Sequence, residues 1–169
     1  MRSAPGSTYK MVVASAALMD GIINLSSTVD CVGTFTRYSD TVMRCWNRSG
    51  HGNLNVTEAI THSCNYFFYE MGYRFGQSGD PESGTDFNLA NERMREYADL
   101  YGLTEKSGIE IEESAPQFSL VNPSQSAIGQ GEHNYTTVGL ARYVATVANS
   151  GTCYNLSLLD KVTDRAETC

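Results

Sequence analysis

The sequence predicts a helix-rich α+β domain with little sheet. The chain has 169 residues, which is enough for one domain with a true hydrophobic core. Its 41% hydrophobic and 18% charged residues are typical of a globular protein. Apolar residues recur at helical spacing in several segments, whereas only one stretch, close to the C-terminus, looks like a strand.

The first predicted helix runs from Thr8 to Asp20, and Gly21 is a natural end for it. The dipeptide Pro5-Gly6 precedes it, which places Ser7 at its N-terminus. One face of this helix follows the i, i+3, i+4, i+7 spacing and consists of Met11, Ala14, Ser15 and Leu18.

The middle of the chain predicts turns and short extended segments followed by two helices. Residues 22–53 are rich in Gly, Ser and Thr. Asn55 followed by Glu58 resembles a capping box that opens a short helix through His62. Residues 65–75 form a densely aromatic segment that Gly76 ends, and residues 77–85 predict a polar loop.

The C-terminal half predicts two more helices and one strand. A helix over residues 91–101 has the apolar face Met94, Tyr97, Ala98 and Tyr101. A helix over residues 136–149, closed by Gly151, has the predicted inward face Val138, Ala141, Val144, Ala145 and Ala148. Residues 153–163 predict the strand.

Charge and hydropathy exclude some classes of function. The net charge is −7 and the pI is about 4.9, so no basic surface exists to neutralise the phosphates of a nucleic acid. The longest apolar stretch, Met11 to Met19, is far below the roughly 20 residues that cross a bilayer, and no signal-peptide pattern is present. We therefore expect a soluble chain that does not bind nucleic acid.

The stretch PGSTYK contains a serine and a lysine at positions that share one face of a helix, Ser7 and Lys10. Serine is a poor nucleophile unless an adjacent base removes its proton, and a partly buried lysine can be that base. The helix N-terminus also favours negative charge on the serine oxygen. The spacing alone is equally typical of two solvated polar residues on an ordinary helix.

A second motif strengthens the catalytic interpretation. Penicillin-recognising serine enzymes combine S-x-x-K with S-x-N and K-[ST]-G, in this order. Ser63-Cys64-Asn65 is an S-x-N at a predicted junction between two helices. On its own it could equally cap the second of these helices.

Three blocks of the sequence carry a family resemblance: PGSTYKMVVASAALMDGII, GHGNLNVTEAITHSCNYFFYEMG and SAIGQGEHNYTTVGLARYVATVANSGT. They resemble the transpeptidase domain of class B penicillin-binding proteins, and most closely the elongation type that builds the side wall of rod-shaped bacteria. The resemblance covers residues 5–160. It implies the helical core of the penicillin-binding, serine β-lactamase-like transpeptidase fold, lacking most of the central antiparallel sheet.

The resemblance implies a role for each matched residue. Ser7 is the nucleophile that attacks a D-Ala carbonyl of a peptidoglycan stem peptide, and Lys10 is its base. Ser63 relays protons to the leaving or arriving amine. Asn65 binds the amide of the acyl group and helps to fix Lys10. Gly129-Gln130-Gly131 resembles the GQG turn that shapes the backbone beside the site.

The resemblance also implies partners and a location. The expected ligands are peptidoglycan stem peptides and β-lactam antibiotics, and catalysis needs no cofactor. The parent protein is expected to be anchored in the bacterial cytoplasmic membrane, with this domain on the outer face and a glycosyltransferase of the elongation machinery as partner. A β-lactam sensor, a serine β-lactamase and a non-catalytic helical module remain alternatives.

The third motif departs from the family pattern. The only K-S-G is Lys106-Ser107-Gly108, at a place where family members carry a non-catalytic KTGI stretch. We therefore expect residues 1–169 to be a partial transpeptidase domain, without the membrane anchor, the pedestal domain, and the C-terminal strands that carry the true motif. Losing one oxyanion donor lowers rates about 10²–10³-fold. The isolated chain is expected to have little or no activity.

Three cysteines and a histidine lie within 34 residues in the order Cys31, Cys45, His51 and Cys64. They form a suitable Cys3His ligand set for zinc, and the resemblance implies a structural zinc site in this region of some relatives. A Cys31–Cys45 disulfide, a Cys64 that is only a small buried residue, and a His51 that only bonds a turn remain alternatives. Cys153 and Cys169 have no predicted role.

Overall fold

The computed structural model describes residues 1–77 and 84–162 of the chain. The predicted loop over residues 77–85 therefore falls mostly outside the described residues. The helices are α1 (Lys10–Met19), α2 (Val56–Thr61), α3 (Asn65–Phe75), α4 (Phe87–Leu100), α5 (Pro123–Ala127) and α6 (Thr137–Ala148), and a 3-10 turn, η1 (Gly6–Tyr9), leads into α1. The helix-rich prediction is confirmed.

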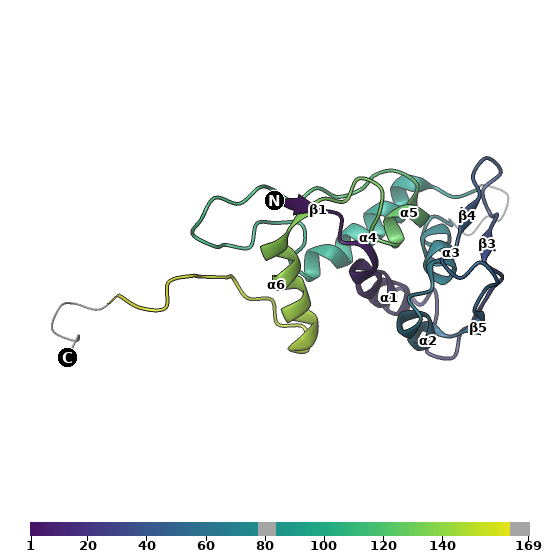
Figure 1. Cartoon of the computed structure of the whole chain (residues 1–169), viewed down its shortest axis with the longest axis horizontal. Helices are drawn as coiled ribbons and strands as arrows, with labels where there is room; N and C mark the ends of the chain where they lie inside the picture. Colours follow the sequence, from purple (N-terminus) through teal and green to yellow (C-terminus); the bar gives the residue numbers. More distant parts are fainter. Residues whose placement is uncertain (78–83, 163–169) are drawn as a thin grey trace.

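The described strands are two or three residues long and form three antiparallel pairs. β1 (Arg2–Ser3) pairs with β6 (Tyr135–Thr136). β2 (Val29–Cys31) pairs with β5 (Gly52–Leu54), and β3 (Thr34–Phe35) pairs with β4 (Met43–Arg44). Figure 1 shows β3, β4 and β5 gathered at one end of the molecule beside α2 and α3, whereas β1 and α6 lie toward the other end.

Helix α3 lies at the centre of the core because its aromatic face is completely enclosed. Phe67, Phe68, Met71 and Phe75 have no exposed surface, and α1, α4 and α5 all pack against this helix. The bounds of α3 agree with the predicted segment, residues 65–75, and Gly76 follows its last residue. Burying side chains of this size stabilises the fold by about 1.5–3 kcal/mol each.

The predicted capping box is confirmed at the start of α2. Asn55 Oδ1 accepts a hydrogen bond from the Glu58 amide at 3.0 Å, and Glu58 Oε2 accepts one from the Asn55 amide at 2.9 Å. The two bonds satisfy donors that the first turn of a helix otherwise leaves free. The end of β5 and the start of α2 are therefore fixed by neighbouring residues.

The predicted inward face of α6 is wrong, and the apolar face predicted for α1 is only part of its buried surface. In α1, Ala14 is buried and Met11, Ser15 and Leu18 are half-buried, but Val12, Val13, Ala16 and Ala17 are fully buried as well, because neighbours surround this helix on most sides. In α6 the residues Ala141, Val144, Ala145 and Ala148 are exposed, and Val138 is half-buried.

Polar contacts decide which face of α6 is buried. The Tyr143 hydroxyl donates to the Thr8 carbonyl at 2.8 Å, and the Arg142 guanidinium donates to the carbonyls of Gly102 and Lys106. These partners turn Arg142, Tyr143 and Thr146 inward. A pattern of apolar spacing does not contain this information.

The predicted strand over residues 153–163 is also wrong for its described part. Residues 153–162 form no strand, and most of their side chains are exposed. Figure 1 shows this stretch extending away from the helices. A β-strand requires a partner strand, and the only hydrogen bond between backbone groups from this stretch to a distant described segment joins the Leu156 amide to the Ser107 carbonyl at 2.9 Å.

Two further helices differ from the prediction, α4 in where it begins and α5 because no helix is predicted there. α4 begins four residues before the predicted start because Asp86 caps it, accepting from the amides of Asn88 and Leu89. α5 is not predicted, although Asn122 and Pro123 are a good cap and first residue. Within the described residues, none of the helices has the length and apolar character needed to cross a membrane.

Candidate active site

Ser7 and Lys10 stand at the start of α1 and share one side of a tight turn. Ser7 belongs to the 3-10 turn η1, and Lys10, the first residue of α1, donates its backbone amide to the Ser7 carbonyl. Side chains three residues apart eclipse each other in a 3-10 turn, so this geometry places Ser7 and Lys10 in one row. Ser7 is exposed, whereas Lys10 is only 2% exposed.

Lys10 connects the two predicted motifs. Its ammonium nitrogen, Nζ, donates to the Ser63 carbonyl at 2.8 Å, to Ser63 Oγ at 3.0 Å and to Asn65 Oδ1 at 2.7 Å. Nζ also lies 5.5 Å from the centre of the Phe68 ring. The structure therefore joins Lys10 to residues 53 and 55 positions away in the sequence.

The environment of Lys10 favours its neutral form more than water does. Burial of the ammonium group lowers the pKa of Lys10 to about 8. Its three hydrogen-bond acceptors are a carbonyl, a hydroxyl and an amide, and among the described residues no carboxylate forms an ion pair with it. A lysine in such surroundings can act as a general base near neutral pH.

Ser63 occupies an unusual backbone position. Its φ is 48°, in the left-handed region that glycine normally fills at the end of a helix. The Cys64 amide donates to the Ala59 carbonyl at 2.9 Å and the Ser63 amide to the Ile60 carbonyl at 3.0 Å, which is the Schellman pattern at the end of α2. A serine here costs about 1–2 kcal/mol of backbone strain, and it directs a hydroxyl to Lys10.

The GQG turn packs against the backbone beside Ser7. The Gly6 amide donates to the Gly129 carbonyl at 3.0 Å. Gly129 has φ +70°, and a Cβ there would lie 2.1 Å from the Gly6 carbonyl oxygen, so only glycine fits. Gln130 is exposed, and its side-chain nitrogen lies 3.8 Å from the place a Gly6 Cβ would take. Gly131 also has a positive φ.

Lys106-Ser107-Gly108 lies in a separate hydrogen-bond network. The amide and hydroxyl of Ser107 donate to Glu113 Oε2, both at 2.7 Å, and the Lys106 carbonyl accepts from Arg142. Among the described contacts, none joins this tripeptide to Lys10. Its surroundings explain the segment as a structural turn.

The four predicted metal ligands converge in one cluster. The ligand atoms of Cys31, Cys45, His51 and Cys64 all lie within 4.8 Å of one another. The three cysteines are buried and free of disulfide bonds, so the disulfide alternative does not describe this structure. Pairing of Cys31 with Gly52 across β2 and β5 brings His51 beside Cys31.

The spacing of the cluster fits tetrahedral zinc. His51 Nδ1 lies 3.5 Å from Cys31 Sγ and 3.6 Å from Cys45 Sγ, and the sulfurs of Cys45 and Cys64 are 4.0 Å apart. A tetrahedral zinc with sulfur ligands at about 2.3 Å and nitrogen at about 2.0 Å separates its ligands by roughly 3.5–3.8 Å. Three thiols and one imidazole are also the donor types that zinc prefers.

The surroundings favour the protonation states that bind metals for His51 and Cys45. Burial, followed by the charge of His62, lowers the pKa of His51 and so favours the neutral imidazole. Burial opposes ionisation of Cys45, but hydrogen bonds from the backbone of Tyr66, Asn47 and Asn65 outweigh it and lower its pKa. For Cys64, burial raises the pKa of the thiol.

Phe68 contacts Lys10, and Trp46 contacts Ser63, which is a hydrogen-bond partner of Lys10; neither is predicted as a site residue. Phe68 lies beneath the Lys10 ammonium, and the Trp46 indole donates to the carbonyls of His62 and Ser63. Trp46 is the only tryptophan of the chain and directly follows Cys45. Its place beside a predicted metal ligand is the sequence signal that could have identified it as a site residue.

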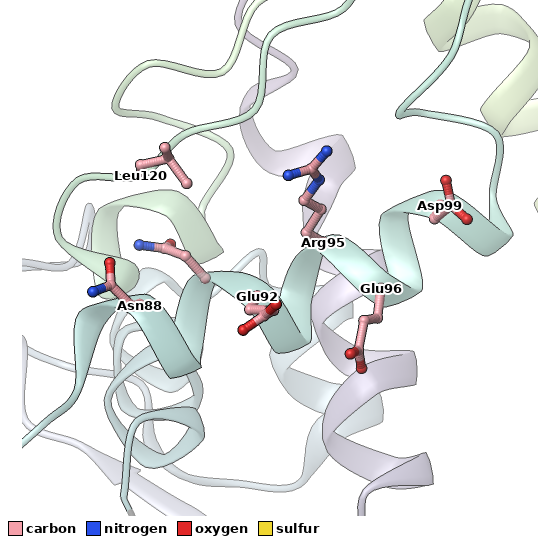
Figure 2. Close-up of a pocket in the computed structure, with 7 residues that line it drawn as sticks. Asn88, Glu92, Arg95, Glu96, Asp99 and Leu120 are labelled. Atoms are coloured by element: carbon pink, nitrogen blue, oxygen red, sulfur yellow. The ribbon is translucent and has the colours of Figure 1, made fainter.

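A separate groove of about 460 Å³ runs along α4 (Figure 2). In Figure 2, Asn88, Arg95 and Asp99 project from this helix, and Leu120 lies above it on a neighbouring segment. The groove is lined by Asn88, Asn91, Glu92, Arg95, Glu96, Asp99 and Leu120. It contains none of the predicted site residues, so it is not part of the candidate active site.

The chain matches a known family over nearly its whole length. The family described as "Penicillin binding protein transpeptidase domain" matches residues 1–168. Stage V sporulation protein D of Bacillus subtilis is 29% identical over 157 residues, which cover 89% of this chain and 22% of that protein. Peptidoglycan D,D-transpeptidase MrdA of Acinetobacter baumannii is 26% identical over 163 residues, 87% of this chain and 22% of that protein.

A solved structure has the same fold. A chain of a peptidoglycan synthase complex that coordinates polymerization and crosslinking superposes with a TM-score of 0.80 at 26% identity, over 95% of this chain and 28% of that chain. The chain thus spans 22% to 28% of the length of these three proteins.

Proposed function

Because the chain belongs to the penicillin-binding protein transpeptidase domain family, we propose that it carries part of the acylating centre of a peptidoglycan D,D-transpeptidase. Ser7 is the nucleophile and Lys10 is its base. The observation that supports this assignment best is the group of hydrogen bonds from Lys10 Nζ to Ser63 and Asn65. They unite S-x-x-K with S-x-N in the order that the chemistry needs.

The reaction divides into acylation and transfer. Neutral Lys10 takes the proton of Ser7 Oγ, and the oxygen attacks the carbonyl carbon of the penultimate D-Ala. The C–N bond to the terminal D-Ala breaks, and its amine leaves with a proton that passes through Ser63. An amine of a second stem peptide then attacks the Ser7 ester and returns a proton to the centre. Ser7 is released and a new peptide cross-link remains.

Asn65 has two tasks in this proposal. Its Oδ1 accepts from Lys10 Nζ at 2.7 Å, so its amide NH2 group is the part of the side chain that would donate to the acyl group of the stem peptide. The GQG turn, through the Gly6–Gly129 hydrogen bond, holds the backbone that enters η1. β-Lactam antibiotics acylate the same Ser7.

The transpeptidase is favoured over a serine β-lactamase. A β-lactamase needs a group that activates water to hydrolyse the ester, and the hydrogen-bond partners of Lys10 in the described residues are only Ser63 and Asn65. The relatives named for an activity are D,D-transpeptidases. A long-lived acyl-enzyme is therefore expected.

We further propose that the chain is part of a longer, membrane-anchored protein that works outside the cytoplasmic membrane. The matched relatives are several times longer than the chain. A glycosyltransferase partner agrees with the solved complex that couples polymerization to crosslinking. Strands beyond the described residues would supply the K-[ST]-G motif, so residues 1–169 alone should react slowly or not at all.

The test is labelling with a fluorescent penicillin. In the longer protein, label should appear at Ser7, persist for many minutes, and be lost in Ser7→Ala. Ser3→Ala, an exposed serine of the same segment, is the control that should label normally. Absence of label from the folded longer protein would contradict the proposal, and rapid hydrolysis of the ester would favour a β-lactamase.

The Cys3His cluster is proposed to hold a structural zinc ion. The metal would link β2, β4, β5 and the start of α3, and through Cys64 it would help to hold the S-x-N motif. Purified chain should contain one zinc per molecule by elemental analysis. Cys45→Ser should lose it, whereas Cys153→Ser, an exposed cysteine outside the cluster, should keep it. Free thiols without zinc would refute the assignment.

A further inference from the structure

Trp46 makes an unusual pair of hydrogen bonds for a side chain on the surface. Trp46 as a whole residue is 60% exposed, yet its indole N–H points back to the protein. Nε1 donates to the His62 carbonyl at 3.1 Å and to the Ser63 carbonyl at 3.2 Å. Both carbonyls belong to the turn that joins α2 to α3.

The Ser63 carbonyl is where Trp46 and Lys10 meet. A carbonyl oxygen has two lone pairs, and here the donors are Lys10 Nζ at 2.8 Å and the Trp46 indole. Ser63 has φ 48°, a conformation that its own backbone does not favour, so contacts from outside must hold it. The same residue presents its hydroxyl to Lys10.

Trp46 is itself held in place on its other side. It directly follows the buried Cys45, whose amide donates to the Gly33 carbonyl at 2.9 Å. The indole also meets the His51 ring edge-on, with 4.9 Å between ring centres. The position of its N–H is therefore set by the β3–β4 hairpin and the Cys3His cluster.

We propose that Trp46 is a positioning residue for acylation: its indole N–H holds the Ser63 carbonyl, and thereby the Lys10 ammonium and the Ser63 hydroxyl, in register with Ser7. This inference rests on the proposed function. Two simpler roles compete with it. The indole could only cap the end of α2 through the His62 carbonyl, or its exposed face could only contact the ligand.

The first experiment does not depend on acylation. Because the chain has one tryptophan, a ¹⁵N spectrum of the 169-residue chain contains a single indole resonance. Its N–H should exchange with solvent at least tenfold more slowly than that of free tryptophan, although most of the residue is exposed. Lys10→Ala should shift the resonance, because the Lys10 ammonium and the Trp46 indole both donate to the Ser63 carbonyl. Free exchange, or no shift in Lys10→Ala, overturns the inference.

The second experiment measures acylation in the longer protein with Trp46→Phe and with a site-specific Trp46→benzothienylalanine. The latter keeps the double ring and replaces only the N–H. Loss of one hydrogen bond should slow the acylation step about threefold to tenfold, with the dissociation constant of the penicillin unchanged. Val42→Ala is the control, because it removes an apolar side chain that is 59% exposed on the same hairpin.

The outcomes separate the three roles. An unchanged acylation rate, or an equal loss in Val42→Ala, overturns the inference. A loss confined to the dissociation constant identifies a ligand contact, and a loss of thermal stability alone identifies a cap for α2. Either result also overturns it. If the wild-type longer protein is not labelled at Ser7, the proposed function has failed, and the indole experiment still tests the contact with Ser63.

Discussion

Replacing Ser63 by Ala and by Gly separates the strain in its backbone from the chemistry of its hydroxyl. Ser63 follows the last turn of α2 with φ 48°, and its Oγ accepts from Lys10 Nζ at 3.0 Å. Both variants lose that hydrogen bond. Only Gly relieves the left-handed backbone.

Two opposing backbone effects predict that the glycine variant is more stable than the alanine variant. Alanine retains a left-handed penalty of about 1–2 kcal/mol, which glycine avoids. Glycine in turn has more freedom in the unfolded chain, which costs about 0.4–1 kcal/mol. Ser63→Gly should therefore be more stable than Ser63→Ala by about 0.8 kcal/mol, which is the difference between the middles of these two ranges. Both should lack normal acylation in the longer protein.

Urea denaturation followed by the fluorescence of the single tryptophan measures the difference. Ala145→Gly is the reference, because Ala145 is exposed inside α6 and glycine there should lower the free energy of unfolding by about 1 kcal/mol. If Ser63→Ala equals or exceeds Ser63→Gly in stability, the left-handed assignment is refuted. Normal acylation in either variant would refute the role of the hydroxyl.

Three further predictions concern a base, a buried histidine and a glycine. In the longer protein the acylation rate should rise with pH and level off above about pH 8, since burial lowers the pKa of Lys10 to about 8 and the neutral amine is the base; a rate that is flat from pH 6 to 9 contradicts this. Burial also lowers the pKa of His133 to about 4, below its unfolded value of about 6.5, so its contribution to stability is complete above pH 6.5 and is lost as the pH falls toward 4. Urea unfolding should show a loss of up to about 3 kcal/mol over this range, and His133→Gln should reduce that slope. Gly129→Ala should destabilise the chain by about 2 kcal/mol or more because its Cβ meets the Gly6 carbonyl oxygen, whereas Gly151→Ala, with a positive φ but no atom within 4 Å, should cost less; equal melting temperatures would refute the clash.

Local signals were sufficient for several elements. The Asn55–Glu58 capping box and the glycine after residue 75 act within one turn of the chain. α3 begins and ends as predicted, and α2 begins as predicted and ends one residue before the predicted His62. The S-x-x-K spacing likewise places Ser7 and Lys10 on one side of a turn without help from distant residues. In each case the deciding contacts span three or four residues.

Local signals failed where a partner from another segment decides the outcome. The buried face of α6 depends on backbone carbonyls at Thr8, Gly102 and Lys106, which no spacing rule reveals. The apolar residues between 153 and 162 suit a strand, but in the described part of the chain they find no strand to pair with. A helix satisfies its own hydrogen bonds, whereas a strand cannot.

The sequence by itself determined which chemical groups this protein has: a serine and a lysine on one turn, an S-x-N, a GQG turn and a Cys3His set. Only the tertiary structure decided that Lys10 contacts Ser63 and Asn65, and that the three thiols and His51 lie within 4.8 Å of one another. The physical reason is that chemical type is a property of each residue. Proximity between separate segments of the chain is instead decided by the packing of α1, α3 and the short strand pairs against one another.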